Sequence, residues 1–230
     1  MDAIMAWSTG KDSALALHRV LEQGTIEVKA LLTTVGSEFD RVSMHGVRRE
    51  LAEAQARSLG LELLAVEVPS DCTMERYGEI MTSALERAGA GGITAVVFGD
   101  LFLEDVRAYR ESQLAGVGIE PVFPLWGEDT AALAAEMIDS GLRAIVTCVD
   151  TEQMDGELAG RLYDRGFLES LPEGVDPCGE NGEFHTFCFS SPDFAEPVPF
   201  TTGEAVLRDG RFRFIDLLPR QCLSCCGHLY

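Results

Sequence analysis

Residues 3–13, AIMAWSTGKDS, decide the fold of this protein. Ala3–Trp7 is a short apolar run of strand length, and Ser13–Gln23 repeats its apolar residues with the period of a helix. The loop between them contains Gly10, where the backbone can turn tightly and approach a ligand, and the cation Lys11. Because the first N–H groups of a helix are free and carry partial positive charge, this loop is suited to a phosphate or pyrophosphate.

This loop does not match either of two common phosphate-binding motifs. A Walker A loop needs a glycine five residues before Gly10, where the chain has Met5, and a Ser or Thr after the lysine, where it has Asp12. A dinucleotide-binding turn needs several glycines, and Gly10 stands alone. The simplest alternative to a phosphate site is a helix that Asp12 or Ser8 caps, with Lys11 in solvent.

Beyond this loop, short apolar runs alternate with segments of helical period. The pattern predicts strands over residues 27–35, 61–68, 94–98 and 119–123, separated by helices over residues 44–59, 74–88 and 104–114. This alternation is typical of βαβ units, which form a parallel sheet with helices on both faces. Because such sheets bind ligands outside the carboxyl ends of their strands, we expect the site in the loops that follow the strands.

The helix predicted over residues 74–88 has an apolar stripe. Met74, Tyr77, Met81 and Leu85 recur at intervals of three and four residues. We expect these side chains to belong to the hydrophobic core rather than to a cofactor site.

The pattern changes after Pro124. A helix over residues 130–140 and strands over residues 144–150, 183–189 and 205–218 follow, and the last contains a hairpin turn at Asp209-Gly210. Pro and Gly become frequent around the loop Asp176–Thr186. We therefore predict an α/β protein with a parallel-sheet domain over residues 1–124 and a smaller α+β region over residues 125–230.

The composition limits the partners of the protein. The chain of 230 residues has 18 Lys and Arg against 38 Asp and Glu, which gives a formal charge of −20. This charge repels nucleic-acid phosphates and anionic membranes, so we expect neither partner. The apolar runs are far shorter than the ~20 residues of a membrane span. The odd number of cysteines, 7, argues against a disulfide framework and favours a cytoplasmic protein.

The loop Ser8-Thr9-Gly10-Lys11-Asp12-Ser13 resembles the pyrophosphate loop (PP-loop), Ser-Gly-Gly-Lys-Asp-Ser, of the N-type ATP pyrophosphatases. These enzymes cleave ATP between its α- and β-phosphates, transfer AMP to an oxygen of the substrate, and let a nitrogen or sulfur nucleophile displace the AMP. The resemblance implies a Rossmann-like nucleotide α-hydrolase domain with all six loop residues at the nucleotide. Thr9 replaces the usual first glycine and adds a side chain close to the phosphates, which is tolerable if Thr9 keeps an ordinary negative φ.

Within that superfamily the chain is similar to the diphthine–ammonia ligase family and its bacterial relatives over nearly its whole length. The shared segments are Met44-His45-Gly46-Val47-Arg48, Gln55-Ala56, Gly99-Asp100 with Arg107, Arg110 and Glu111, Pro124-Leu125-Trp126, and Gly179–Thr186. The last segment, of the form Gly-Glu-x-Gly-Glu-aromatic-x-Thr, specifies the family. Relatives that act on diphthine usually have a glutamate where this chain has His185.

The resemblance implies an ATP-dependent amide ligase that uses ATP and Mg²⁺. Such an enzyme adenylates a carboxylate of a small molecule or a modified protein and transfers ammonia or an amine to it. The alternatives are an ATP- or AMP-binding protein without ligase turnover, and an ATP pyrophosphatase with a different small-molecule substrate. A tRNA-thiolating activity is disfavoured by the charge of −20. The acceptor, the nitrogen donor and the choice between monomer and homodimer stay open.

The candidate site residues outside the first loop come from several strand ends. The resemblance places Thr33 and Thr34 at the adenine and His45 near the nucleotide. Asp100 follows Gly99 at a strand end, where its carboxylate can hold Mg²⁺ or, alternatively, cap the next helix.

The acids and the histidine of the loop Asp176–Thr186 form the second group of candidates. We expect Glu180, Glu183 and His185 to be catalytic together with Lys11 and Asp100, and Glu183 and His185 to share one strand face. A surface turn with solvated acids is the alternative. Cys222, Cys225, Cys226 and His228 could bind a metal, but a structural zinc site usually has two separated ligand pairs, so a free tail is favoured.

Overall fold

The computed structural model describes residues 1–220 of the protein. The strands of its first sheet are β1 (Asp2–Ala6), β2 (Glu27–Gly36), β3 (Arg41–Val42), β4 (Glu62–Val68), β5 (Ala95–Val97) and β6 (Glu120–Val122). The helices between them are α1 (Lys11–Gln23), α2 (Arg49–Leu59), α3 (Met74–Ala90) and α4 (Glu104–Ala115). The elements predicted from the sequence for this half are therefore present.

The first sheet is parallel except for β3. Strand β1 pairs with β2 and β5, β2 also pairs with β4, and β5 pairs with β6, so the parallel order is β4-β2-β1-β5-β6. Only the two-residue strand β3 runs antiparallel, against the end of β2. The predicted parallel α/β architecture is thus confirmed, and β1 with its phosphate loop lies in the middle of the sheet.

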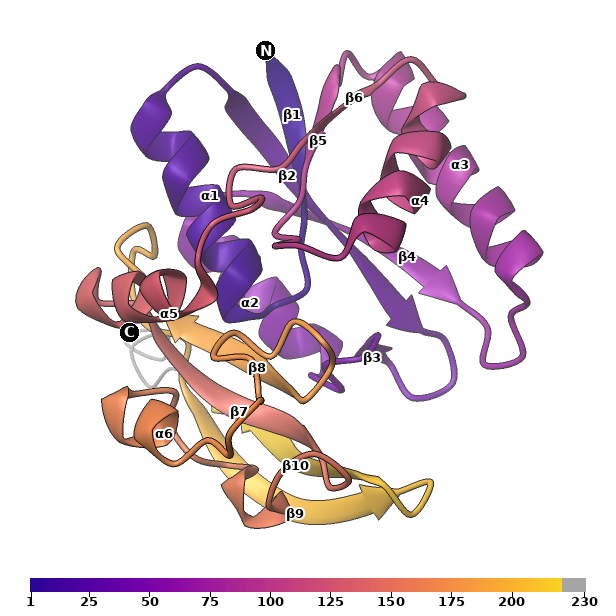
Figure 1. Ribbon diagram of the computed structural model, residues 1–230. Helices are drawn as coiled ribbons and strands as arrows, with labels where there is room; N and C mark the ends of the chain where they lie inside the picture. The colour runs from indigo at the N-terminus through magenta and orange to yellow at the C-terminus, as the bar shows by residue number, and fades with distance from the viewer. Residues whose placement is uncertain (221–230) are drawn as a thin grey trace, which may run out of the picture.

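Helices cover both faces of this sheet, with α1 and α2 on one side and α3 and α4 on the other (Figure 1). The alternation along the strands explains this arrangement, because successive side chains point to opposite faces. Met5 and Leu31 pack in the cluster that includes α1 and α2 residues, whereas Ile4 and Leu32 pack with Leu85 and its neighbours on α3 and α4.

The second half of the chain forms an antiparallel sheet in the order β8-β7-β10-β9. Its strands are β7 (Arg143–Asp150), β8 (Phe184–Ser190), β9 (Phe200–Arg208) and β10 (Phe212–Pro219), accompanied by α5 (Thr130–Asp139), the 3-10 helix Gly156–Leu158 and α6 (Arg165–Glu169). The predicted turn joins β9 to β10, with positive φ at both Asp209 and Gly210. One hydrophobic core runs from the first sheet into this second sheet, since Met5 and Phe187 belong to the same cluster.

The prediction of a helix from Met44 was wrong for its first five residues. Helix α2 begins at Arg49, and the chain before it forms β3 and a tight loop in which Val42 N–H donates to Val47 O. Met44 and Gly46 both have positive φ, at 63° and 67°, which no residue of a right-handed helix adopts. Gly46 was the sequence signal that this segment is a turn.

The prediction for the apolar stripe of α3 was wrong in part. Leu85 is buried, at 4% exposure, but Met74 is 72% exposed. Met81 packs against the core as predicted and, together with Tyr77, also lines a cavity. None of the helices within residues 1–220 combines the length and the apolar character that a membrane span requires.

Candidate nucleotide site

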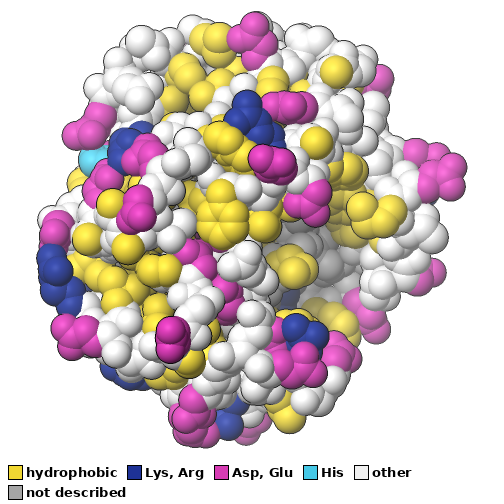
Figure 2. Space-filling model, viewed as in Figure 1, with side chains coloured by type: hydrophobic (Ala, Val, Ile, Leu, Met, Phe, Trp, Pro, Cys, Tyr) yellow, Lys and Arg dark blue, Asp and Glu magenta, His cyan; other side chains and the backbone are white. Residues whose placement is uncertain are grey.

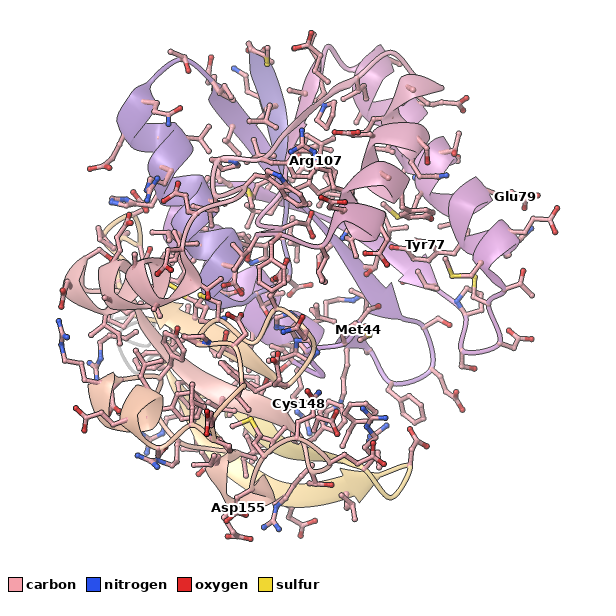
Figure 3. All side chains as sticks on the ribbon, viewed as in Figure 1. Met44, Tyr77, Glu79, Arg107, Cys148 and Asp155 are labelled. Carbon is pink, nitrogen blue, oxygen red and sulfur yellow. The ribbon has the colours of Figure 1, made fainter. Side chains whose placement is uncertain are left out.

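A cavity of about 580 Å³ lies at the carboxyl ends of β1, β2 and β5, where the second sheet closes over the first. Figure 2 shows a hollow in the surface between the two sheets. In Figure 3, Met44 lies at this hollow and Tyr77 lies on the α3 side of it, and both residues line the cavity. The cavity brings together most of the predicted site residues: Ser8, Lys11, Asp12, Ser13, Thr33, Thr34, His45, Gly99, Asp100, Glu180 and His185.

Three of the predicted residues do not line this cavity: Thr9, Gly10 and Glu183. Thr9 and Glu183 are buried at 0% and 1% exposure. Gly10 lies beneath His45, since a Cβ added there would come within 2.7 Å of His45 Cε1. Gly10 is therefore needed for the close approach of this side chain.

No side chain of the phosphate loop caps the start of α1. The N-cap residue is Gly10, which has no side chain to cap the helix, so the alternative of a cap by Asp12 or Ser8 is wrong. Ser8 Oγ instead accepts from Gly10 N–H at 3.2 Å and bonds to Ser13 Oγ. The N–H groups of Asp12 and Ser13 meet no acceptor within residues 1–220. These donors are available to an anion.

Thr9 does not have the negative φ that was the condition for tolerating its side chain in this loop. Its φ is 72°, in the left-handed region that a β-branched residue rarely adopts. Its carbonyl is held by Cys188 N–H at 2.8 Å and by Gln55 Nε2 at 3.0 Å. Gln55 in turn accepts from Trp7 Nε1 at 2.8 Å. This network of buried hydrogen bonds imposes the conformation on Thr9.

Lys11 is buried, at 1% exposure, although it carries a charge. Its Nζ donates to both carboxylate oxygens of Asp12, at 3.0 and 2.9 Å, and to the carbonyl of Cys178. It also lies over the rings of Tyr163 and Phe184, at 5.3 and 5.2 Å from their centroids. Burial by itself lowers the pKa of Lys11, but the charge of Asp12 and its hydrogen bond, together with the neighbouring Cys178 and Glu180, outweigh burial and raise the pKa, so the ammonium stays charged.

The segment Asp176–Thr186 closes over the phosphate loop. Thr186 Oγ1 accepts from Lys11 N–H at 3.1 Å, and Glu180 Oε1 accepts from Leu101 N–H at 2.8 Å. Burial raises the pKa of Glu180 to about 7; the bond from Leu101 opposes this, and the charges of Asp12 and Asp100 add to it. Glu180 is therefore a carboxyl group that can change its protonation state near neutral pH.

Glu183 and His185 were predicted to share one strand face, but their surroundings differ, because His185 lines the cavity and Glu183 does not. Glu183 precedes β8, and its Oε1 accepts from Asp176 N–H and Asn181 Nδ2, both at 3.0 Å. These bonds hold the Asp176–Thr186 loop in shape. A catalytic role for Glu183 stays a prediction.

His45 and His185 form a pair at the edge of the cavity. Their ring centroids are 4.7 Å apart, and His45 Nδ1 bonds to Thr186 O at 2.8 Å. Burial lowers the pKa of His45 to about 4 and that of His185 to about 3, and the positive charge of Lys11 adds to both effects. Both imidazoles are therefore neutral near neutral pH.

Asp100 follows the end of β5, and one of its carboxylate oxygens has no hydrogen-bond partner among the described residues. Its Oδ2 is buried without a hydrogen-bond partner within residues 1–220, and Arg110 Nε is 3.6 Å away. The alternative that Asp100 caps the next helix is wrong, because Leu103 is the N-cap of α4. Oxygen ligands from one or two carboxylates together with phosphates suit Mg²⁺. Asp100 and Asp12, which line the same cavity, therefore fit such an ion.

Sequence reasoning missed several residues of the site. Thr186 was part of a family segment but was not singled out, and Tyr109 and Gln113 of α4, which line the cavity, gave no signal apart from their place on a helix after β5. The tail with Cys222, Cys225, Cys226 and His228 lies outside the described residues. Within residues 1–220, no three His, Cys, Asp or Glu side chains are grouped to hold a metal.

The fold and the site together define a class. A parallel α/β sheet with a lysine-bearing phosphate loop after its central strand, closed by a second, antiparallel sheet, is a nucleotide-binding domain with a smaller C-terminal region. The family model of the diphthamide synthase N-terminal domain matches residues 1–121, and that of the C-terminal domain matches residues 129–207. The chain therefore belongs to the diphthamide synthase family.

Individual relatives agree with the family model. The chain is 33% identical to the diphthine–ammonia ligase of Danio rerio over 223 residues, which covers 87% of this chain and 86% of that protein. It is 25% identical to the diphthine–ammonia ligase of Homo sapiens over 158 residues, 66% of this chain and 58% of that protein. A solved structure, the U34-tRNA thiolase NcsA from Methanococcus maripaludis, matches with 20% identity and a TM-score of 0.37 over 60% of this chain and 57% of that one.

Proposed function

We propose that the protein is an ATP-dependent ligase of the diphthine–ammonia ligase type. It adenylates a carboxylate and transfers ammonia or an amine to it. One observation carries the proposal: the phosphate loop meets the loop Asp176–Thr186, which contains the family-specific segment, at a single cavity. There Lys11 N–H bonds to Thr186 and Lys11 Nζ bonds to the Cys178 carbonyl.

The phosphate loop provides the groups that hold ATP. The N–H groups of Asp12 and Ser13 and the partial positive charge at the start of α1 bind the β- and γ-phosphates. Lys11 adds a full positive charge and stabilises the pyrophosphate that leaves. These local groups are needed because the overall charge of −20 repels ATP.

Asp100 and Asp12 are the residues that would hold Mg²⁺ beside the phosphates. A magnesium ion supplies charge neutralisation on the phosphate oxygens. The buried, unpartnered Oδ2 of Asp100 supports this assignment.

The acceptor enters from the side of the second sheet. An oxygen of its carboxylate attacks the α-phosphorus of ATP, and the bond to pyrophosphate breaks. The nitrogen nucleophile then attacks the acyl carbon, AMP leaves with the former carboxylate oxygen, and the nitrogen loses a proton. Glu180 titrates near neutral pH, so its carboxylate can accept this proton, whereas His185, with its pKa lowered to about 3, is neutral but a weak base.

The identity of the acceptor depends on His185. Relatives that act on diphthine usually place a glutamate at this position, and an anion there attracts the quaternary ammonium of diphthine. The neutral His185 offers no such attraction. We therefore propose that the acceptor is a carboxylate and that it does not need to carry a quaternary ammonium group.

The test is the formation of AMP and pyrophosphate from ATP in the presence of Mg²⁺, ammonium and a panel of carboxylates. The panel includes a diphthine-bearing protein and free carboxylic acids. We expect at least one acid to trigger AMP release in equal amount to amide. ATP binding without AMP release for every member of the panel contradicts the ligase proposal.

A second candidate, a nucleotide-binding protein without ligase turnover, is favoured by one observation. Lys11 Nζ is already engaged by Asp12 and by the Cys178 carbonyl, and the side chain is almost fully buried. If Lys11 only holds these groups together, Lys11→Met binds ATP as the unchanged protein does and loses stability. A ligase loses turnover in this variant.

A cytoplasmic location is part of the proposal. It is supported by the consumption of ATP and by the cysteines of the described residues, Cys72, Cys148, Cys178 and Cys188, which are all unpaired.

A further inference from the structure

A second cavity, of about 400 Å³, lies between the β9–β10 hairpin and the segment that joins β2 to α2. The hairpin lies below β3 in Figure 1. This cavity adjoins the nucleotide cavity, because Val42, Ser43, Met44 and His185 line both. No residue of the phosphate loop, residues 8–13, lines it. The second cavity is therefore left for another reactant when the phosphates of ATP occupy the loop.

One row of side chains across the second sheet forms the floor of this cavity. Val206 of β9 pairs with Phe214 of β10, and Phe214 pairs with Cys148 of β7, which Figure 3 labels. Cys148 pairs in turn with His185 of β8. Residues that are directly opposite on neighbouring strands have their side chains on the same face of the sheet. The row therefore leads from the edge strand β9 to His185, where the two cavities adjoin.

The opposite wall comes from the segment before α2. Gly46 lies against the Phe214 ring, since a Cβ added to Gly46 would come within 2.9 Å of Phe214 Cδ1. Arg41 Nη1 donates to Gly46 O at 2.8 Å and to Asp216 Oδ1 at 2.9 Å, which ties this wall to β10. The two walls are thus joined to each other, as in a ligand site that is formed before its ligand binds.

Much of the lining of this cavity is apolar. The apolar side chains include Phe39, Val42, Met44, Val206, Phe212 and Phe214. Phe39, Met44 and Val206 are exposed. Exposed apolar side chains that gather around a cavity mark a binding site for apolar groups. The second cavity is therefore suited to a ligand with an apolar body.

Arg208 occupies the aromatic faces at this cavity. Its guanidinium lies 5.3 Å from the ring centroid of Phe39 and 5.9 Å from that of Phe214. Aromatic faces are the usual partners of a quaternary ammonium, so a cationic ligand would meet a like charge there. Glu204 and Asp209 also line the cavity, but both are exposed, and water and salt weaken their attraction for a cation. An uncharged body suits the cavity better.

We propose that the second cavity binds the acceptor of the ligase reaction, and that this acceptor is a small carboxylic acid with an uncharged, apolar body. Its carboxylate lies at the end that His185 and Ser43 share with the nucleotide cavity. Its body extends along the row of Phe214 toward β9. The inference rests on the proposed ligase activity, and it adds the class of acceptor and the residues that select it.

The test compares two pairs of acids. Betaine and tert-butylacetate have the same shape, but betaine carries a quaternary ammonium where tert-butylacetate has a carbon. Hydrocinnamate and acetate differ in the size of the apolar body. Calorimetry measures the binding of each acid to the protein loaded with α,β-methylene-ATP, and AMP formation is measured with ATP, Mg²⁺ and ammonium. We expect about tenfold tighter binding of tert-butylacetate than of betaine, and of hydrocinnamate than of acetate.

Val206→Asn and Leu207→Asn are a matched pair of variants. The two residues are neighbours on β9 and are similarly exposed, at 45% and 56%, but their side chains point to opposite faces of the sheet. Val206→Asn should weaken the binding of hydrocinnamate about threefold to fivefold and leave that of acetate unchanged. Leu207→Asn should change neither, because Leu207 does not line the cavity. Arg208→Gln should narrow the preference for tert-butylacetate over betaine.

Three results for the unchanged protein overturn the inference, and they need no variant to fold. These are equal binding of tert-butylacetate and betaine, equal binding of hydrocinnamate and acetate, and no binding of any of the four acids. Equal weakening by Val206→Asn and Leu207→Asn also overturns it. The expected binding pattern without AMP formation contradicts the ligase proposal and leaves the acid site in place. AMP formation that does not depend on the apolar body supports the ligase proposal and overturns the acceptor class.

Discussion

The backbone N–H of Lys11 donates to the hydroxyl of Thr186 at 3.1 Å, across 175 positions of the chain. Lys11 is the first residue of α1, and Thr186 belongs to β8 in the second sheet. The first N–H groups of a helix have no partner within the helix, and Gly10 at the N-cap has no side chain that could accept from any of them. The phosphate loop is therefore completed by the other half of the molecule.

Replacing this hydroxyl should loosen the phosphate loop. Thr186→Val keeps the shape of the side chain but leaves the buried Lys11 N–H without an acceptor. We expect the free energy of unfolding to fall by about 1–2 kcal/mol. Thr186→Ser keeps the hydroxyl and should lose less. Chemical denaturation measures both variants.

Thr147→Val is the matched control, because Thr147 is equally buried and its Oγ1 has no partner within residues 1–220. Removing this hydroxyl should not lower the free energy of unfolding. Equal losses in the two valine variants would show that the bond to Lys11 contributes nothing beyond packing.

The positive φ of Thr9 predicts an unusual order of stabilities. A residue with a Cβ costs about 1–2 kcal/mol in the left-handed region, whereas glycine adopts it freely. Thr9→Gly should therefore be more stable than Thr9→Ala by about 1 kcal/mol. Thermal or chemical unfolding of the two variants measures this difference.

Ala54→Gly in α2 gives the reference for an ordinary helical position. There the glycine variant should be less stable by about 0.5–1 kcal/mol. If Thr9→Ala is as stable as Thr9→Gly, or more stable, the backbone of the phosphate loop does not have the conformation described above.

Gly10 and His45 should be energetically coupled. Gly10 has an ordinary φ of −87°, so the main obstacle to alanine there is the His45 ring, which a Cβ would approach to 2.7 Å, against 3.3 Å for Ser8 Oγ. Gly10→Ala should lower the free energy of unfolding by about 1–3 kcal/mol. In a His45→Ala background the same change should cost much less, and a double-mutant cycle measures the difference.

Gly36→Ala is the control for this cycle. Its nearest neighbour would lie 3.8 Å from the added Cβ, and Gly36 should show no coupling to His45. A Gly10→Ala penalty that is the same with and without the His45 ring would place the clash elsewhere in the loop.

Glu180 should make stability depend on pH. Its folded pKa of about 7 lies above the ordinary value of 4.5, mainly because of burial, so the folded protein binds a proton more tightly than the unfolded chain does. The stabilisation is complete below pH 4.5 and is lost as the pH rises through about 7. Glu180→Gln should remove this loss.

The measurement is the free energy of unfolding across this pH range for the two proteins. The exposed Glu86 on α3 provides a control, since Glu86→Gln should leave the pH profile unchanged. A parallel profile for the unchanged protein and Glu180→Gln would show that this carboxyl titrates normally in the fold.

Much of the fold could be predicted because it depends on local patterns. The period of Ser13–Gln23 and the apolar run Ala3–Trp7 produce α1 and β1 as expected, and the alternation of strands and helices gives the parallel sheet. The start of α2 could not be predicted, because the bond from Val42 to Val47 and the positive φ of Met44 depend on how the loop packs. The division of the chain after residue 124 stays a prediction.

The sequence predicted which residues belong to the candidate site, but it did not predict the contacts that they make. Lys11, Glu180 and His185 line one cavity as expected, and their roles in catalysis stay predictions. Glu183 was expected beside His185, yet hydrogen bonds to Asp176 and Asn181 hold it inside the loop. A pattern of residue types does not reveal which acceptor a side chain will find.

The sequence by itself determined the phosphate loop and the family segment, because both are short runs whose residue types specify their chemistry. Only the tertiary structure decided that Thr186 completes the start of α1, that Thr9 adopts a positive φ, and that Tyr109 and Gln113 face the nucleotide cavity. These features arise where the second sheet, α3 and α4 pack around the carboxyl ends of the strands. Contacts between segments so far apart in the chain are set by packing and by buried hydrogen bonds, which leave no periodic signal in the sequence.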